Sequence, residues 1–165
     1  RSRLFIAIRF EKSILDPLIK LQDDLRDMGV KGNYTKHENL HLTLAFIGEY
    51  KDPGEVLDVM EQIEFTPFDL ELDGVGSFGD IFWAGISDNP SLTSYVKRLR
   101  HELAENGIPF DKKKFSPHIT LIRKAFYKDH KMIPVSEPPK GRMTVSGISL
   151  MKSERGKNGM IYTEL

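Results

Sequence analysis

The sequence of 165 residues contains no cysteine and no long apolar run. Without cysteine the chain has no disulfide framework, no thiolate nucleophile and no Cys-ligated zinc, so any metal site would need histidine and carboxylate ligands. Its longest apolar runs, such as Leu4 to Ile8, fall far short of the roughly 18 residues that span a bilayer. We therefore expect no signal peptide, no membrane partner and a cytoplasmic location.

The sequence also has no net charge, because 24 Lys and Arg balance 24 Asp and Glu, but the two signs are segregated. Residues 1–82 hold 9 basic and 16 acidic side chains, whereas residues 83–165 hold 15 basic and 8 acidic ones. The stretch 97–131 has ten basic against four acidic residues, a surplus that would attract an anion such as a phosphate backbone. The run Lys112 to Lys114 is equally typical of a solvated surface.

A strand followed by an amphipathic helix is predicted twice, 78 residues apart. The first copy has an apolar run at 4–8, then apolar residues at helical spacing and a glycine stop: Ile14, Leu18, Leu21, Leu25, Met28 and Gly29. The second copy has an apolar run at 82–86 and the matching residues Leu92, Val96, Leu99, Leu103 and Gly107. This agreement indicates two copies of one supersecondary unit.

The remaining patterns complete an α+β fold. We expect a helix near 55–63, a strand near 68–72, and a C-terminal strand pair near 142–152 and 160–165, with a long Pro-rich surface connection over 126–141. Residues 1–165 should form a single domain without a linker, and a monomer. Its two pseudo-twofold-related lobes would each be an antiparallel-rich sheet with helices on the outer face, enclosing a central cleft.

Two short predicted strands carry the same His-x-Thr motif, as His41-Leu42-Thr43 and His118-Ile119-Thr120. Because side chains alternate along a strand, the His and Thr of each motif point to the same face. Five His and seven Thr in 165 residues give only about 0.2 chance occurrences of this motif. Chance therefore does not account for two copies at equivalent points of a repeat.

A pair of imidazoles across one cleft can supply one neutral base and one charged acid, because a pKa near 6.5 allows both states. In-line displacement at phosphorus needs both groups, and threonine hydroxyls can bind the non-bridging oxygens. A metal site is less favoured, since the pair lacks a third ligand. We expect no metal and no cofactor, with these catalytic residues: His41, Thr43, His118 and Thr120. His37, His101 and His130 have no matching partner and should lie on the surface.

The segments 38–44 and 115–123 resemble the paired signatures of the two-histidine (2H) phosphoesterases, specifically the RNA 2′,3′-cyclic phosphodiesterases, also called 2′-5′ RNA ligases. The resemblance extends over nearly the whole chain. It implies metal-free hydrolysis of RNA 2′,3′-cyclic phosphate ends to 2′-phosphomonoesters, with His41 as proton donor and His118 as proton acceptor. It also implies the reverse joining of an RNA 5′-hydroxyl to a cyclic phosphate.

Five further residues are weaker candidates for substrate binding. Arg123 follows His118 by five residues and would face away from it on an ideal strand, so a twist would be needed for it to reach a phosphate. Tyr34 and Phe115 precede the two motif strands and could stack on a base or pack in the core. Ser153 and Tyr162 come from the predicted C-terminal hairpin, whereas we expect Trp83 only to pack.

Two other functions remain open at this point. One is a non-catalytic RNA or nucleotide-binding module, which the basic second half of the chain would suit. The other is a phosphodiesterase that acts on 2′-5′ oligonucleotides or on small cyclic nucleotide phosphates. Turnover of 2′,3′-cyclic phosphates would distinguish the first from an enzyme, and a comparison of substrates would distinguish the second.

Overall fold

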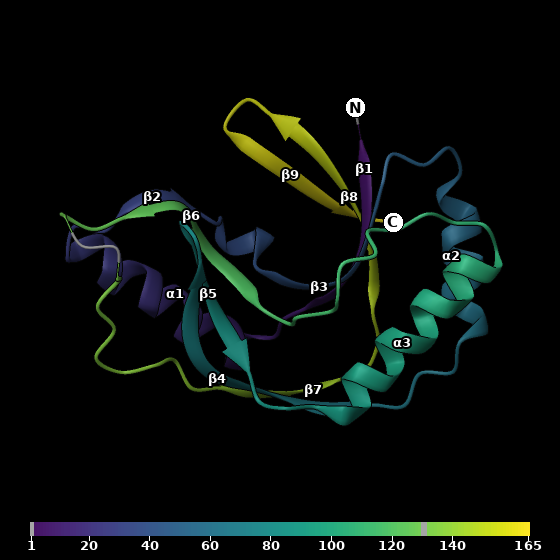
Figure 1. Ribbon diagram of the computed structural model, residues 1–165, viewed down its shortest axis with the longest axis horizontal. Coiled ribbons are helices and arrows are strands. Elements are labelled where there is room, and N and C mark those ends of the chain that lie inside the picture. Colours follow the sequence, from purple (N-terminus) through teal and green to yellow (C-terminus); the bar gives the residue numbers. More distant parts are fainter. Residues whose placement is uncertain (1, 130–131) are drawn as a thin grey trace.

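The structure is a computed structural model that describes residues 2–129 and 132–165. Its strands form two antiparallel sheets, one of four strands and one of five (Figure 1). The elements in chain order are β1 (Arg3–Arg9), α1 (Lys12–Asp27), β2 (Lys31–Tyr34), the 3-10 turn η1 (His37–Asn39), β3 (His41–Gly48), α2 (Pro53–Gln62), β4 (Phe68–Phe78), β5 (Ile81–Ile86), α3 (Pro90–Glu105), β6 (Ile119–Phe126), β7 (Arg142–Val145), β8 (Ser149–Gly156) and β9 (Gly159–Glu164). None of the helices in these ranges is long and apolar enough to cross a membrane.

The strand orders are β3-β1-β8-β9 and β2-β6-β5-β4-β7. This architecture confirms the expected α+β fold of antiparallel sheets with helices outside them (Figure 1). The predicted C-terminal strand pair was wrong in one respect, because its first member is two strands that belong to different sheets. β7 pairs with β4, whereas β8 pairs with β1 and forms a hairpin with β9. The short strand β2, which pairs with β6, was not predicted.

The helices α1 and α3 each have 16 residues, and the bounds of α3 are those of α1 displaced by 78 positions. Each helix is followed by a glycine with positive φ, +97° at Gly29 and +70° at Gly107, a conformation that glycine adopts without steric cost. Each helix packs on the sheet that does not contain the strand preceding it in the chain. α1 packs on β6 and β7 of the five-stranded sheet, whereas α3 packs on β3 of the four-stranded sheet.

Alternation along β1 explains how the four-stranded sheet separates a core from a second apolar face. Leu4, Ile6 and Ile8 are buried in the main core beneath the helices. Phe5 and Ala7 belong to a separate small cluster with Met151 of β8, against which Tyr162 of β9 packs. That second face carries the first histidine motif.

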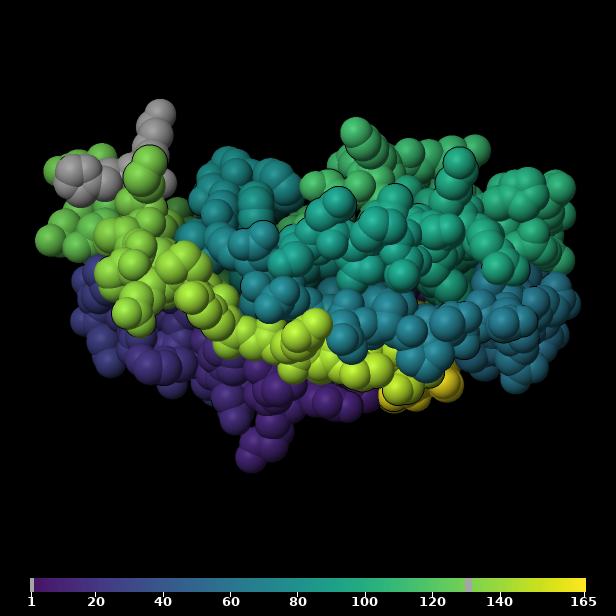
Figure 2. Space-filling view, turned by 90° about the horizontal axis from the view of Figure 1, so that it is seen from below, coloured from purple at the N-terminus to yellow at the C-terminus, as the bar shows by residue number. Residues whose placement is uncertain are grey.

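The connection from β6 to β7 is long, as expected, and runs over the surface. Figure 2 shows the chain beyond residue 132 as a yellow-green band between the purple N-terminal part and the teal middle part of the chain. Its prolines Pro134, Pro138 and Pro139 line a groove of about 1470 Å³ together with α1 and β4. His37 and His101 are exposed, as predicted, and His130 lies outside the described residues.

Candidate functional site

The two His-x-Thr motifs lie on neighbouring strands of the two sheets: β3 is the edge of the four-stranded sheet, and β6 is the second strand of the five-stranded one. His41 begins β3 and His118 directly precedes β6. Some Cα atoms of β3 and β6 come within 8 Å of each other. The rings are close enough that the positive charge of His118 lowers the pKa of His41. Folding therefore brings the two motifs, 77 positions apart in the sequence, into one electrostatic environment.

Both imidazoles are held in the same tautomer by the backbone. Nδ1 of His41 lies 2.7 Å from the carbonyl oxygen of Asn39, and Nδ1 of His118 lies 2.7 Å from that of Ser116. Because a carbonyl oxygen can only accept, each Nδ1 carries the hydrogen and donates it. In each ring, Nε2 is therefore the nitrogen that is left to accept or donate a proton. In His41 this atom lies 2.9 Å from the Thr43 hydroxyl oxygen.

The environment of His41 disfavours its charged form. Burial lowers the pKa of His41 below its usual value of 6.5, and the hydrogen bond to the Asn39 carbonyl opposes this effect. The positive charges of Arg123 and His118 lower that pKa further. An anion between the two rings would offset both charges.

Each imidazole packs against two aromatic rings. His41 lies 4.9 Å from the ring of Phe5 and meets the ring of Tyr162 edge-on at 5.4 Å. His118 meets Phe78 edge-on at 5.0 Å and lies 6.3 Å from Trp83. These contacts restrict both rings without occupying Nε2.

Glycine makes room for the wall beside His118. A Cβ atom on Gly76 would lie 2.4 Å from the Trp83 ring, so the absence of a side chain here lets the indole approach the β4 backbone closely. The expectation that Trp83 packs holds, but the packing partners include the second motif histidine.

A β-bulge places Arg123 on the face of β6 that carries the motif threonine. Phe82 lies opposite Ile122 but Trp83 lies opposite Thr120, so β6 has one extra residue at Leu121. An extra residue reverses the alternation, which places Arg123 on the same face as Thr120. Burial agrees, because Leu121 and Ile122 are both inaccessible whereas Arg123 is exposed. The argument from an ideal strand therefore gave the wrong face for Arg123.

Charge interactions support this placement of Arg123. Burial raises the pKa of Tyr162, and the positive charge of Arg123 opposes that rise. The same guanidinium contributes to the lowered pKa of His41. Arg123 thus lies close enough to His41 and Tyr162 of the other sheet for its charge to act on both.

The motif strand β3 has a matching bulge. Ile6 lies opposite Ala45 and Ala7 opposite Thr43, which leaves Leu44 as the extra residue. Phe46 consequently lies on the same face as Thr43, and it is 39% exposed. It stands five residues after its histidine, as Arg123 does. Sequence reasoning missed Phe46, because an aromatic residue in an apolar strand is typical of the core.

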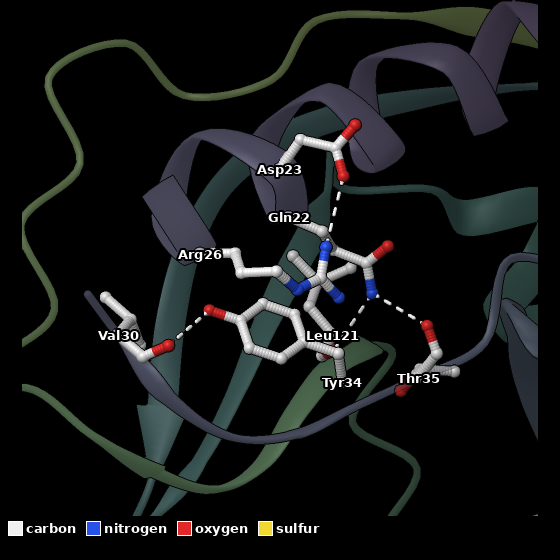
Figure 3. A network of polar contacts seen from close by, with 7 residues as sticks. All are labelled: Gln22, Asp23, Arg26, Val30, Tyr34, Thr35 and Leu121. Atoms are coloured by element: carbon white, nitrogen blue, oxygen red, sulfur yellow. Dashed lines mark hydrogen bonds and ion pairs between the residues drawn. The ribbon is translucent and has the colours of Figure 1, made fainter. Parts of the chain in front are cut away.

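The other predicted binding residues divide into two groups. Ser153 is buried on β8 opposite Tyr162, so both belong to the wall beside His41. Tyr34 and Phe115 have contacts away from the histidines. The Tyr34 hydroxyl donates to the Val30 carbonyl at 2.7 Å, and the Arg26 guanidinium lies 4.2 Å above its ring (Figure 3).

Phe115 packs beneath the guanidinium of Arg100, 5.7 Å from its ring centre, and against the main core. Phe5 and Phe78, which do contact the histidines, were not predicted as site residues. The only available signal was their alternation within apolar strands, which does not distinguish the cleft face from the core face. Among the described residues, no group of three or more His, Asp or Glu is arranged to hold a metal ion.

Two antiparallel sheets that bring paired His-x-Thr strands together are the features of a two-histidine phosphoesterase. A model of the 2′-5′ RNA ligase superfamily matches residues 15–157 of the chain. The chain belongs to this superfamily, which confirms the resemblance drawn from its motifs.

Similar proteins cover almost the full length. RNA 2′,3′-cyclic phosphodiesterases of Thermotoga maritima and Escherichia coli K12 are 29% and 30% identical, over 99% of this chain in both cases and 92% and 93% of the relatives. The crystal structure of E. coli LigT complexed with 3′-AMP superposes with a TM-score of 0.82. It is 29% identical, and the match covers 99% of this chain and 94% of that one.

Proposed function

We propose that the protein hydrolyses RNA 2′,3′-cyclic phosphate ends to 2′-phosphomonoesters without a metal ion. His118 takes a proton from the attacking water as its oxygen bonds to phosphorus. The bond from phosphorus to the 3′ oxygen breaks, and His41 gives that oxygen its proton. Proton exchange with solvent then restores both rings.

The observation that carries this proposal is the pair of imidazoles in one electrostatic environment, each with Nδ1 committed to a backbone carbonyl. Two Nε2 atoms are thereby left for proton transfer. The relatives named RNA 2′,3′-cyclic phosphodiesterases support the choice of substrate. A nucleotide complex of E. coli LigT supports nucleotide binding by this fold.

The lowered pKa of His41 fits an acid that becomes protonated mainly when its substrate binds. In the ligand-free protein, burial and the charge of Arg123 favour the neutral ring. A bound phosphate is negative and would offset that charge, so the pKa of His41 rises on binding. The acid is then protonated mainly in the complex, where it is needed.

Residues on the cleft face supply the remaining contacts. The hydroxyls of Thr43 and Thr120 can donate to the non-bridging oxygens, and Arg123 can neutralise their charge. Exposed Phe46 offers a stacking surface for the terminal base. Ser153 and Tyr162 complete the wall behind His41.

The same site could join RNA ends. An RNA 5′-hydroxyl in place of water would lose its proton to His118 as its oxygen bonds to phosphorus, the bond from phosphorus to the 3′ oxygen would break, and His41 would give that oxygen its proton. The product is a 2′-5′ phosphodiester with a free 3′-hydroxyl. Membership of the 2′-5′ RNA ligase superfamily favours testing this second activity.

A product assay tests the proposed hydrolysis. Adenosine 2′,3′-cyclic phosphate and an RNA with a cyclic phosphate end are incubated with the protein, and chromatography separates 2′- from 3′-monophosphates. The proposal expects the 2′ product. A 3′ product would exclude the stated regiochemistry, and tight binding without turnover would favour a non-catalytic RNA-binding module.

A further inference from the structure

The bulge in β6 is held from behind by a buried glutamine. Gln22 lies on α1 with none of its surface exposed. Its Nε2 donates to the carbonyl oxygens of Thr35 at 2.9 Å and of Leu121 at 3.1 Å (Figure 3). Leu121 is the extra residue of the bulge, and the Thr35 N–H also donates to its carbonyl at 2.9 Å.

The bulge in β3 is held in the same way by an arginine. Arg100 lies on α3, and its Nη1 donates to the carbonyl oxygen of Lys113 at 2.7 Å. Its Nη2 donates to the carbonyl oxygen of Leu44 at 3.2 Å. Leu44 is the extra residue of that second bulge.

The two sets of contacts are made by residues at equivalent positions of the repeat. Gln22 and Arg100 are 78 positions apart, as are Thr35 and Lys113, and the two bulge residues are 77 apart. Each helix side chain therefore holds a loop of its own copy and the bulge of the other copy. This exchange follows from the packing of α1 on β6 and of α3 on β3.

The burial of Gln22 is not explained by core packing. Its helix neighbours in the core are leucines, and a leucine there would need no hydrogen bonds. Gln22 also leaves its own Oε1 without a partner among the described residues, which is unfavourable in a buried site. The Gln22 amide provides hydrogen-bond donors for carbonyl groups near the bulge, where the hydrogen bonding between strands is interrupted.

We propose that Gln22 and Arg100 are paired positioning residues that hold the two bulges and thereby turn Arg123 and Phe46 to the cleft. Neither touches the substrate. Gln22 acts on Arg123 through Leu121, and Arg100 acts on Phe46 through Leu44. The kinetic consequence rests on the proposed function, whereas the structural consequence does not.

The structural test uses amide exchange and needs no activity. Gln22→Met keeps the side-chain volume and removes both donors. We expect about tenfold faster exchange at the Thr35 amide, which bonds to the β6 bulge, and no change at the Asp111 amide, which donates to Phe46 beside the β3 bulge. Arg100→Met should produce the opposite pair of results. Equal changes at both amides would mean general destabilisation and would overturn the proposal.

The kinetic test uses double-mutant cycles with the cyclic nucleotide. We expect Gln22→Met to lower kcat/KM about tenfold in the wild type but less than about threefold in an Arg123→Met background. Arg100→Met should couple to Phe46→Ala in the same manner. The crossed pairs, Gln22 with Phe46 and Arg100 with Arg123, should be additive and serve as matched controls.

Two further results separate positioning from loss of stability. Asn89→Ala removes another amide donor, which bonds to the Asp69 carbonyl, together with the N-cap of α3, and should show neither coupling. Gln22→Met should also move the alkaline limb of the pH profile to higher pH, because Arg123 would lie farther from His41 and would lower its pKa less. Additive cycles at all four pairs would refute the proposal. If the wild type has no turnover, the proposed function fails, and amide exchange alone decides the inference.

Discussion

Arg123→Met tests whether the guanidinium of Arg123 controls the pKa of His41, the proposed acid. The substitution removes a guanidinium whose positive charge lowers the pKa of His41. We expect loss of a charge-assisted contact with the phosphate of about 1.5–3 kcal/mol, which corresponds to a decrease in kcat/KM of about 10- to 150-fold. The pKa of His41 in the free enzyme should rise at the same time.

The pH profile of kcat/KM distinguishes the roles of the histidines. If His41 is the acid, it must be protonated, so a higher pKa extends activity to higher pH and the alkaline limb moves upward. If His41 were the base, the acid limb would move instead. Lys124→Met removes the same charge one residue further along β6 and serves as the control. An unmoved alkaline limb, or an equal loss of activity in the Lys124 variant, would refute the reasoning.

Three other predictions concern the two imidazoles, the Trp83 ring and the metal independence of the reaction. His41→Ala and His118→Ala should each lower kcat by about 10²- to 10⁴-fold with the fold intact by circular dichroism, and full activity in either would exclude paired-histidine catalysis. Gly76→Ala should displace Trp83, the only tryptophan, which fluorescence would detect. It should also lower the free energy of unfolding by about 1–3 kcal/mol, measured by thermal unfolding, and lower kcat. Gly147→Ala, where a Cβ atom meets open space, is its control, and equal effects would contradict the proposed contact. The rate should be the same in excess EDTA, and a loss restored by a divalent cation would contradict metal-independent chemistry.

The sequence by itself determined the motifs, the helices and the fold class. Helical spacing of leucines, glycine stops and the 78-residue offset are local signals, and α1 and α3 begin and end at that offset. The His-x-Thr motifs were visible because a period of two residues places His and Thr on one face of a strand. These features depend on near neighbours in the chain, so they can be read without coordinates.

Only the tertiary structure decided which further residues lie on the same strand faces as the motif residues. The bulges at Leu44 and Leu121 reverse the alternation, and they depend on pairing with other strands and on donors from distant helices. Arg123 was therefore assigned the wrong face, and Phe46 was not noticed. Tyr34 is close to the first motif in sequence, yet its hydroxyl bonds to Val30 and its ring lies under Arg26. A period-two pattern gives the face of a strand only until an inserted residue shifts it, and long-range contacts decide where that insertion occurs.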